Sequence, residues 1–405
     1  MTCEWPLMGR AEELGLISDA LVGEDGVKGF VIAGAAGVGK TRLAREALAV
    51  AASRGMQTQW VAATQSAQPV PLGAFSDVVS HFGPDPGLRV REVIAALAPR
   101  HGASPPVVLG VDDAHLLDDL SALVVHQLLL RQVMRVVITV RSGELAPDAV
   151  TSVWKDRLAE RLDLQSLSLD ETTILLEAVL GGQLDSRSVR RLWTLSRGNA
   201  LYLRQLVDEE IASERLENIA GVWIWSGEPI ISASLADLVA ARMGRLSPKL
   251  VDVVDSLALC EPLDSDVLSR VTQRIAVEEA ETQGLITLAT EDGSSRTVRL
   301  AHPLFGEVRR AGCGTLRKAR IRGQIASELA GHRCADMREV VHRAILTLDS
   351  DLAPNPTSGV LADPTAGTGG GPHQTSSPSP GLRDQCAARW ARKPVRRVLR
   401  GDSFL

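Results

Sequence analysis

The stretch Gly34-Ala35-Ala36-Gly37-Val38-Gly39-Lys40-Thr41 decides the fold of this 405-residue chain. It matches the pattern G-x-x-x-x-G-K-[ST] at all four fixed positions. Residues 29–33 before it are apolar and of strand character, and residues 42–50 after it are rich in strong helix formers. A glycine loop between a strand and a helix turns backbone N–H groups and the positive end of a helix dipole toward one point, where phosphate binds.

The residue types in this loop predict a nucleoside triphosphate site. Lys40 is expected to reach the β- and γ-phosphates, and the hydroxyl of Thr41 is expected to ligate Mg²⁺. The alternative is a glycine-rich turn without chemical meaning, which the strand–loop–helix context disfavours. The expected nucleotide contacts in this segment are Gly34, Ala35, Ala36, Gly37, Val38, Gly39, Lys40, Thr41 and Arg42.

The composition indicates a globular protein that lacks several common signatures. Hydrophobic residues make up 45% of the chain and aromatic residues 3%, so the core must be aliphatic. The net charge of −5 gives no basic excess for non-specific nucleic-acid binding. The five cysteines are scattered without a CxxC pair, so neither a disulfide framework nor a zinc site is predicted. With no membrane-length apolar run and no signal-peptide pattern, we expect a cytoplasmic protein without membrane contact.

Strand-like and helix-like segments alternate from residue 30 to about residue 169. The strands are expected at 30–33, 57–62, 106–111, 135–140 and 162–167, and helices between them include 74–81 and 88–97. This alternation predicts an α/β fold, a parallel sheet with helices on both faces.

The third expected strand ends in two carboxylates, Asp112 and Asp113. An apolar run followed by a pair of aspartates, after a complete phosphate loop, is typical of the Walker B arrangement. Asp112 is expected to hold Mg²⁺, directly or through water, and Asp113 to orient or deprotonate the attacking water. The alternative is an ordinary strand followed by an acidic turn.

The fourth expected strand leaves Thr139 and Arg141 at its carboxyl end. In a parallel sheet this edge faces the ligand, so Arg141 is a candidate catalytic contact to the γ-phosphate, beside Asp113 and Lys40. A surface arginine in a loop is an equal alternative.

After residue 170 the pattern becomes helical. Helices are expected at 169–180, 186–195 and 201–216, with a break at Gly198-Asn199 and a small hairpin around Trp223 and Trp225. Helices at 235–246, 248–259 and 265–276 precede strands at 284–290 and 296–300 and a helical run through about residue 329, which predicts a winged helix.

The C-terminal composition differs from the rest of the chain. Residues 351–381 are dominated by Pro, Gly, Ser and Thr, which predicts disorder, and the arginine-rich end without periodicity is typical of an out-of-frame or decayed coding end. The expected domains are a nucleotide-binding domain at 1–169, a helical lid at 170–234, a winged-helix domain at 235–350 and a tail at 351–405.

With these segments in order, the chain resembles the STAND class of AAA-related P-loop ATPases, and within it the ATPase portion of large LuxR-type transcriptional regulators of actinobacteria. The segments that carry the resemblance are Gly9–Glu13, Gly34–Thr41, Val111–Asp119, Thr139–Arg141, Gly198–Leu203 and Ala301–Leu304. The resemblance covers about residues 5–345. Such regulators continue into helical repeats and a DNA-binding helix-turn-helix, and residues 351–405 show neither pattern.

The resemblance implies a lid and a winged helix that close over ATP or ADP. By this likeness Met8, Gly9 and Arg10 would lie near adenine, and His302 would approach the phosphates from the winged helix. A capped surface helix at the N-terminus and a buried structural histidine are the alternatives. Family members usually have proline at the position of Ala200 and tryptophan at that of Leu116.

The sequence therefore predicts a transcription-related switch that binds ATP with Mg²⁺, hydrolyses it slowly to ADP, and acts on a regulatory protein partner or a second copy. We do not expect this chain alone to bind DNA. The alternatives are a non-hydrolysing interaction module that keeps its nucleotide, and a DNA-binding AAA protein similar to replication initiators.

Overall fold

The structure is a computed structural model, and it describes residues 5–22, 29–78, 85–98, 106–290, 296–331 and 337–352. All of these belong to one compact unit, Met1–Ala353. The predicted tail 351–405, apart from its first two residues, lies outside the described residues, as does the predicted turn at 291–295.

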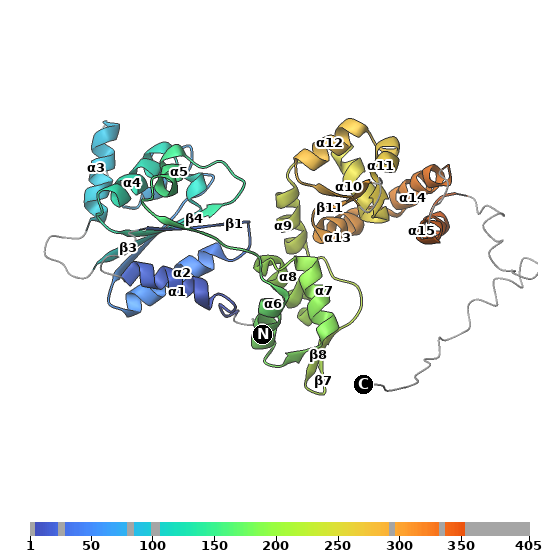
Figure 1. Ribbon diagram of the computed structural model, residues 1–405, viewed down its shortest axis with the longest axis horizontal. Coiled ribbons are helices and arrows are strands. Elements are labelled where there is room, and N and C mark those ends of the chain that lie inside the picture. The colour runs from blue at the N-terminus through green and yellow to red at the C-terminus, as the bar shows by residue number, and fades with distance from the viewer. Residues whose placement is uncertain are drawn as a thin grey trace, which may run out of the picture. The chain divides into compact units, whose positions relative to one another are not determined.

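A five-stranded parallel sheet forms the core of the N-terminal part (Figure 1), with the strand order β2-β3-β4-β1-β5. β1 and β3 are buried at every residue, as expected for strands covered on both faces. The strands are β1 Gly29–Gly34, β2 Gln57–Ala62, β3 Val107–Asp112, β4 Arg135–Arg141 and β5 Glu160–Asp163.

Helices cover both faces of this sheet, which confirms the predicted fold class. Helices α1 and α2 lie on one face and α3, α4 and α5 on the other (Figure 1). Their bounds are α1 Ala11–Val22, α2 Lys40–Ser53, α3 Pro86–Leu97, α4 Asp119–Leu130 and α5 Asp148–Lys155, with short 3₁₀ turns at Gly73–Phe75 and Ala114–Leu116.

The register of the sheet brings the ends of four strands to one edge. Gly34 at the end of β1 pairs with Arg141 at the end of β4, and Ala62 at the end of β2 pairs with Asp112 at the end of β3. Since all the strands are parallel, the phosphate loop, the two aspartates and Arg141 follow the same edge, where ligands of such sheets bind.

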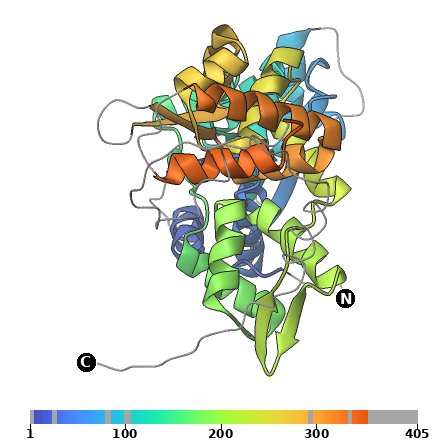
Figure 2. The same cartoon turned by 90° about the vertical axis from the view of Figure 1, so that its right-hand side faces the viewer.

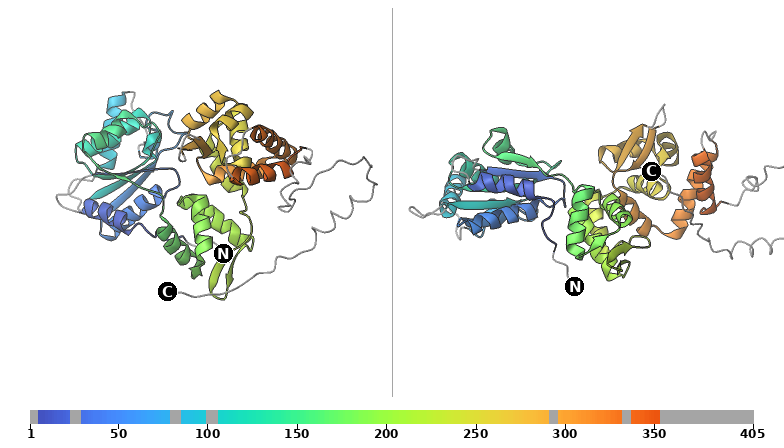
Figure 3. Two further views of the ribbon diagram at one scale, coloured as in Figure 1. Left: turned by 45° about the vertical axis from the view of Figure 1, so that its right-hand side comes forward. Right: turned by 60° about the horizontal axis from the view of Figure 1, so that its bottom comes forward.

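The chain then forms three helices and a small sheet. The helices α6 Leu169–Leu180, α7 Ser186–Ser196 and α8 Ala200–Ala212 lie side by side, green in Figure 3. The sheet has the order β6-β8-β7, and its β7–β8 hairpin confirms the one predicted around Trp223 and Trp225. Its strands are β6 Gln183–Leu184, β7 Leu216–Ile219 and β8 Val222–Trp225, and α9 Ala233–Met243 follows.

The last part has the predicted helices followed by a β-hairpin, and it adds a short strand, β9, between two of the helices. The three strands pair as β10-β11-β9. The elements are α10 Pro248–Cys260, β9 Leu263–Asp264, α11 Ser265–Val271, α12 Arg274–Thr282, β10 Ile286–Thr290 and β11 Arg296–Leu300. Three helices follow, α13 Pro303–Gly312, α14 Thr315–Ala330 and α15 Met337–Leu348, of which α14 and α15 lie side by side (Figure 2). One apolar core runs from α6 through α15.

Two predicted elements in the sheet region differ from the structure. The helix expected at 74–81 is wrong over its described residues, because Leu72 adopts φ 60° with its N–H bound to Asp118, and a 3₁₀ turn buries Phe75. The fifth strand, expected at 162–167, is Glu160–Asp163, since pairing with β1 ends at Ala33 and the chain then leaves the sheet toward α6.

Two long predicted helices are each divided in two. The helix expected at 265–276 breaks at Thr272, which has φ −110° and ψ −127°, and the run expected through residue 329 breaks at Cys313. The break at Gly198 is confirmed, as is the start of α13 at His302-Pro303.

Candidate nucleotide-binding site

The phosphate loop joins β1 to α2 and is shaped by close contact with the start of α8. Gly37 has φ 81°, and a Cβ on it would lie 2.5 Å from Oδ1 of Asn199. Helix α2 begins at Lys40 without a side-chain cap, so its first N–H groups face the same edge of the sheet as the loop amides. This is the geometry that binds phosphate at a helix N-terminus.

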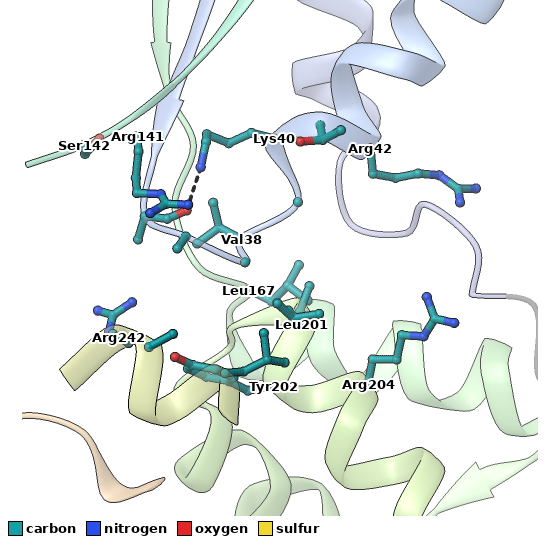
Figure 4. Close-up of a pocket in the computed structure, with 18 of the residues that line it drawn as sticks. Val38, Lys40, Arg42, Arg141, Ser142, Leu167, Leu201, Tyr202, Arg204 and Arg242 are labelled. Atoms are coloured by element: carbon teal, nitrogen blue, oxygen red, sulfur yellow. Dashed lines mark hydrogen bonds between the residues drawn. The ribbon is translucent and has the colours of Figure 1, made fainter. Parts of the chain in front are cut away.

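Lys40 lies at the centre of this region. Its Nζ donates a hydrogen bond to the carbonyl of Ala35 at 2.8 Å (Figure 4), and the residue is 6% exposed. Burial lowers the pKa of Lys40, and the nearby Asp113 carboxylate opposes this shift. A cation held with little water around it is suited to bind a polyanion strongly.

The carboxylate of Asp112 gathers two hydroxyl groups. Thr41 Oγ1 donates to Asp112 Oδ1 at 2.9 Å, and Thr139 Oγ1 donates to the same oxygen at 2.6 Å. Thr139 Oγ1 in turn accepts a hydrogen bond from the N–H of Asp113 at 2.9 Å. Thr139 was noted from its place at the strand end, but its role in fixing both aspartates follows from the structure.

The pair Thr41 and Asp112 fits a magnesium ion. Both offer hard oxygen ligands, and Mg²⁺ in nucleotide sites takes one or two protein ligands while phosphate oxygens and water supply the rest. Over the described residues no group of three His, Cys, Asp or Glu side chains forms a metal site by itself. The structure therefore brings together the two residues predicted to hold the metal, Thr41 and Asp112.

Asp113 lies beside this pair in a strained conformation. Its φ of 49° and ψ of 46° are left-handed, and its side chain, 35% exposed, lines the cavity described below. Non-glycine residues with this backbone concentrate at functional sites. The structure thus places one aspartate against the threonine hydroxyls and the next one toward the cavity.

Arg141 reaches the same cavity but is paired with Glu144, which the sequence patterns did not single out. Arg141 Nη1 lies 2.7 Å from Glu144 Oε1, and the two side chains are 38% and 42% exposed. An exposed pair of this kind contributes only about 0.2–1 kcal/mol to stability. The other carboxylate oxygen, Glu144 Oε2, is 3.2 Å from Nε2 of the buried His115.

Lys40, Thr41, Asp113 and Arg141 all line one cavity of about 970 Å³ (Figure 4). One wall, which we call the sheet wall, includes Ala35–Arg42, Asp113 and Arg141–Glu144. The facing wall, which we call the lid wall, includes Ala200–Tyr202 and Arg204 from α8 and Leu238, Ala241 and Arg242 from α9. In Figure 4 Lys40 and Arg141 face Tyr202 and Arg242 across the cavity. The volume is in the range of small-molecule sites. Tyr202, Arg204 and Arg242 were not predicted, because only the tertiary fold brings them there.

The N-terminal segment forms one end of the cavity. Met8 and Arg10 line it with Trp5, Pro6 and Leu7, whereas Gly9 does not. Arg10 is 5% exposed and donates to Glu13 and to the carbonyl of Gln165, so its guanidinium is already engaged. The apolar residues at this end suit the flat face of a base, as expected for Met8.

The helix break at Gly198-Asn199 joins the lid to the phosphate loop. Asn199 Nδ2 donates to the carbonyl of Ala36 at 2.7 Å, and the N–H of Leu201 donates to the carbonyl of Gly37 at 3.1 Å. Asn199 Oδ1 also caps α8 by accepting from Leu201 and Tyr202. A single side chain thus fixes the start of α8 and the backbone that would hold phosphate.

His302 lies behind the lid wall and does not line the cavity. It is 6% exposed, its ring packs edge-on against Tyr202, and its Nδ1 accepts from the N–H of Leu304 at the start of α13. Burial, with smaller contributions from the positive charges of Arg242 and Arg197, lowers the pKa of His302 to about 4. The structure therefore brings His302 to the site only through Tyr202 and Phe305, which do line it. Gly34 and Asp112 also lie just outside the lining, in the buried strand ends.

The sheet order, the phosphate loop after β1 and the aspartates after β3 together define the class. The chain has the fold of a P-loop nucleoside triphosphatase. Within the described part, no helix is both long and apolar enough to cross a membrane.

Among known proteins, the chain is similar to several solved structures. No protein-family model matches the sequence, and no curated protein matches it. The Aeropyrum pernix ORC1 protein, solved in complex with DNA, is similar at 18% identity over 76% of this chain and 94% of that one, with a TM-score of 0.44. The Thermotoga maritima RuvB Holliday junction branch migration motor is similar at 13% identity over 73% and 95%, with a TM-score of 0.37.

A third similar structure is domain III of the Thermotoga maritima replication initiation protein DnaA, at 12% identity over 51% of this chain and 86% of that one, with a TM-score of 0.37. At such low identities and TM-scores, what this chain does has to be inferred from its own residues.

Proposed function

We propose that the chain is a nucleotide-dependent switch that binds ATP with Mg²⁺ and slowly hydrolyses it to ADP and phosphate. The observation that carries the proposal is the convergence of Lys40, the Thr41–Asp112 pair and Asp113 on one edge of the sheet. A nucleoside triphosphate needs a cation, a metal site and a water-positioning carboxylate at this spacing. All three groups lie on the sheet wall of one cavity or directly behind it.

The predicted residues other than His302 take part in this proposal. The loop amides from Gly34 to Gly39 and Lys40 would cradle the phosphates, Arg42 would lie at the start of α2, and Arg141 would contact the γ-phosphate. Thr41 and Asp112 would hold Mg²⁺, which neutralises charge on the phosphates when bound. Asp113 would hold the attacking water and accept its proton.

The base and the lid complete the proposed switch. Met8 and its apolar neighbours would contact the base, with Gly9 and Arg10 holding that segment in place. The lid wall would close on the phosphates, and only contacts that differ between ATP and ADP can shift the lid. We retain the division into domains 1–169, 170–234, 235–350 and the tail 351–405 as part of this proposal.

The finer assignment, to the ATPase portion of a LuxR-type transcriptional regulator of the STAND class, rests on the ordered sequence motifs. The hydrogen bond from Asn199 to the phosphate loop is consistent with the role that such regulators give to this helix break, and it supports this part of the proposal. In this proposal the chain acts on a regulatory protein partner or on a second copy.

Of the two alternatives, DNA binding through the winged helix is the less favoured. The exposed face of α12 carries Glu278, Glu279 and Glu281 against one arginine, Arg274. Carboxylates on that face would repel a phosphate backbone. The other alternative, a non-hydrolysing module, would bind its nucleotide in the same cavity and would differ from the switch only in leaving the nucleotide intact.

A single-turnover ATPase assay separates the switch from the non-hydrolysing module. We expect the wild-type chain with Mg²⁺ to convert bound ATP to ADP, and Asp113→Asn to slow this step at least about 100-fold while still binding ATP. Asp119→Asn is the matched control, because Asp119 is exposed and lies outside the cavity lining. Equal rates for wild type and Asp113→Asn would refute the assigned role, and no hydrolysis by wild type would favour the module.

A further inference from the structure

The carboxylate of Glu144 lies between two partners. One of its oxygens is 2.7 Å from Arg141 Nη1, and the other is 3.2 Å from Nε2 of His115. Glu144 follows β4 by three residues and lines the cavity on its sheet wall. From this position, a small rotation of the Glu144 side chain would bring its carboxylate closer to either Arg141 or His115.

His115, one of the two partners of Glu144, has ring nitrogens that are unsatisfied within the described part of the chain. Its side chain is 1% exposed, and among the described residues neither ring nitrogen has a hydrogen-bond partner of good geometry. The nearest carboxylates are Glu144, at 3.2 Å, and Asp113, at 3.9 Å. A buried polar group without a partner is costly and rare, so a conformation that satisfies it has an advantage.

Arg141 is the partner that a phosphate would compete for. Its guanidinium lines the cavity beside Lys40, and both Arg141 and Glu144 lie close enough to act on the charge of Lys40. An exposed ion pair with a carboxylate is weak, whereas a guanidinium binds a phosphate by two parallel charge-assisted hydrogen bonds. A phosphate arriving at this position would therefore displace Glu144.

We propose that the terminal phosphate of a nucleoside triphosphate takes Arg141 from Glu144, and that Glu144 then accepts a hydrogen bond from Nε2 of His115. The proposal rests on the proposed nucleotide site and adds two positioning residues to it. With a diphosphate, Arg141 stays with Glu144 and His115 stays unsatisfied. The hydrogen bond that His115 gains favours the triphosphate, whereas the ion pair that Arg141 loses opposes its binding. The exchange also couples the loop after β4 to the segment that carries Asp113.

The test is a double-mutant cycle on Glu144 and Arg141, read by calorimetric binding of Mg²⁺–ADP and of the non-hydrolysable analogue β,γ-imido-ATP. Removing the competing charge frees Arg141, so Glu144→Gln should bind the triphosphate analogue about threefold more tightly and leave ADP affinity unchanged. In an Arg141→Ala background, Glu144→Gln should change neither the affinity for the triphosphate analogue nor the affinity for ADP. The matched control is Glu278→Gln, which removes an exposed arginine–glutamate pair outside the cavity lining.

Two outcomes overturn the exchange. If Glu144→Gln still favours the triphosphate in the Arg141→Ala background, Glu144 acts by simple charge repulsion. If it changes both affinities equally, it has no phosphate-specific role. Failure of wild type to bind either nucleotide would instead overturn the proposed function itself.

The part played by His115 has its own measurement. His115→Leu removes the donor and should lower the triphosphate-to-diphosphate preference about threefold, whereas His115→Gln, which keeps an N–H donor, should restore most of it. A purely packing role for His115 would give the same preference in the Leu and Gln variants, and that result would contradict the proposal. Thermal unfolding of both variants shows whether each has folded.

Discussion

The sheet wall and the lid wall of the cavity differ in how their polar groups are held. On the sheet wall Thr41, Thr139 and Asp112 are bound to one another, and Lys40 is bound to the loop carbonyl of Ala35. On the lid wall the guanidinium of Arg242 interacts with the hydroxyl of Tyr202 and, among the described residues, forms no ion pair. The sheet wall is therefore arranged before any ligand binds, and the lid wall has donors left to respond to one.

The two walls meet at very few hydrogen bonds. Asn199 to Ala36 and Leu201 to Gly37 join α8 to the phosphate loop, and Leu167 to Gly198 joins the start of the lid to its own break. Because so few hydrogen bonds join the two walls, each of these bonds should have a measurable effect on ligand binding or stability. The predictions below test this connection, beginning with the largest expected effect.

Gly198→Ala should damage the connection most. The residue has φ 69°, and a Cβ there would lie 1.9 Å from the carbonyl oxygen of Leu167. Left-handed strain and a backbone clash together should lower the free energy of unfolding by about 4 kcal/mol, as measured by denaturant titration.

The control for this substitution is Gly221→Ala. Gly221 has φ 89° but open space around the position of a Cβ, so only the strain of about 1–2 kcal/mol remains. Equal losses for the two variants would show that the contact with Leu167 does not constrain the break.

Stability should fall with acid through His302. The pKa of His302 is lowered by burial to about 4 in the folded state, while the unfolded value is 6.5. The unfolded state therefore binds a proton first, and stability is lost as the pH falls from 6.5 toward 4, by roughly 3 kcal/mol in all. Above pH 6.5 the residue is neutral in both states and has no effect.

His302→Asn isolates this contribution, since an asparagine at the start of α13 can still accept from the N–H of Leu304 but does not titrate. We expect the variant to lose less stability than wild type between pH 6.5 and 4.5 in parallel unfolding titrations. Identical pH profiles would mean that His302 is not buried as a neutral ring.

Asn199→Ser should produce the smallest and most specific change. Serine keeps the cap of α8 but cannot reach the carbonyl of Ala36, so the loss is one hydrogen bond of about 1 kcal/mol to the phosphate loop. Nucleotide affinity should fall about fivefold, and the unfolding midpoint should fall only by the small amount that one hydrogen bond contributes. Asn199→Ala, which loses the cap as well, should also lower the midpoint; a midpoint equal to that of Asn199→Ser would contradict the division of roles.

Most of the sheet wall could be predicted from the sequence, whereas most of the lid wall could not. The phosphate loop and the two aspartates are short local patterns whose residue types are required by their chemistry, and the structure places Lys40, Thr41, Asp112 and Asp113 close together. The alternation of strands and helices was enough to predict a parallel sheet with both faces covered.

The rest depended on tertiary contacts that leave no local pattern. Glu144 and Tyr202 reach the cavity from a loop and a helix that the fold alone brings to it, and His302 is turned away by its packing against Tyr202. Similarly, the helix expected at 74–81 was lost because the side chain of Asp118, far along the chain, binds the N–H of Leu72. Residue patterns cannot show such partners before the chain is folded.

The central claim is that the cavity holds a triphosphate on Lys40. It is tested most directly by calorimetric titration of ATP with Mg²⁺ into wild type, Lys40→Ala and the control Lys155→Ala, whose lysine is exposed and outside the cavity lining. Removing a buried cation from the phosphates should weaken ATP binding at least about 100-fold in Lys40→Ala and leave Lys155→Ala unchanged. Undiminished ATP affinity in Lys40→Ala would contradict the assignment.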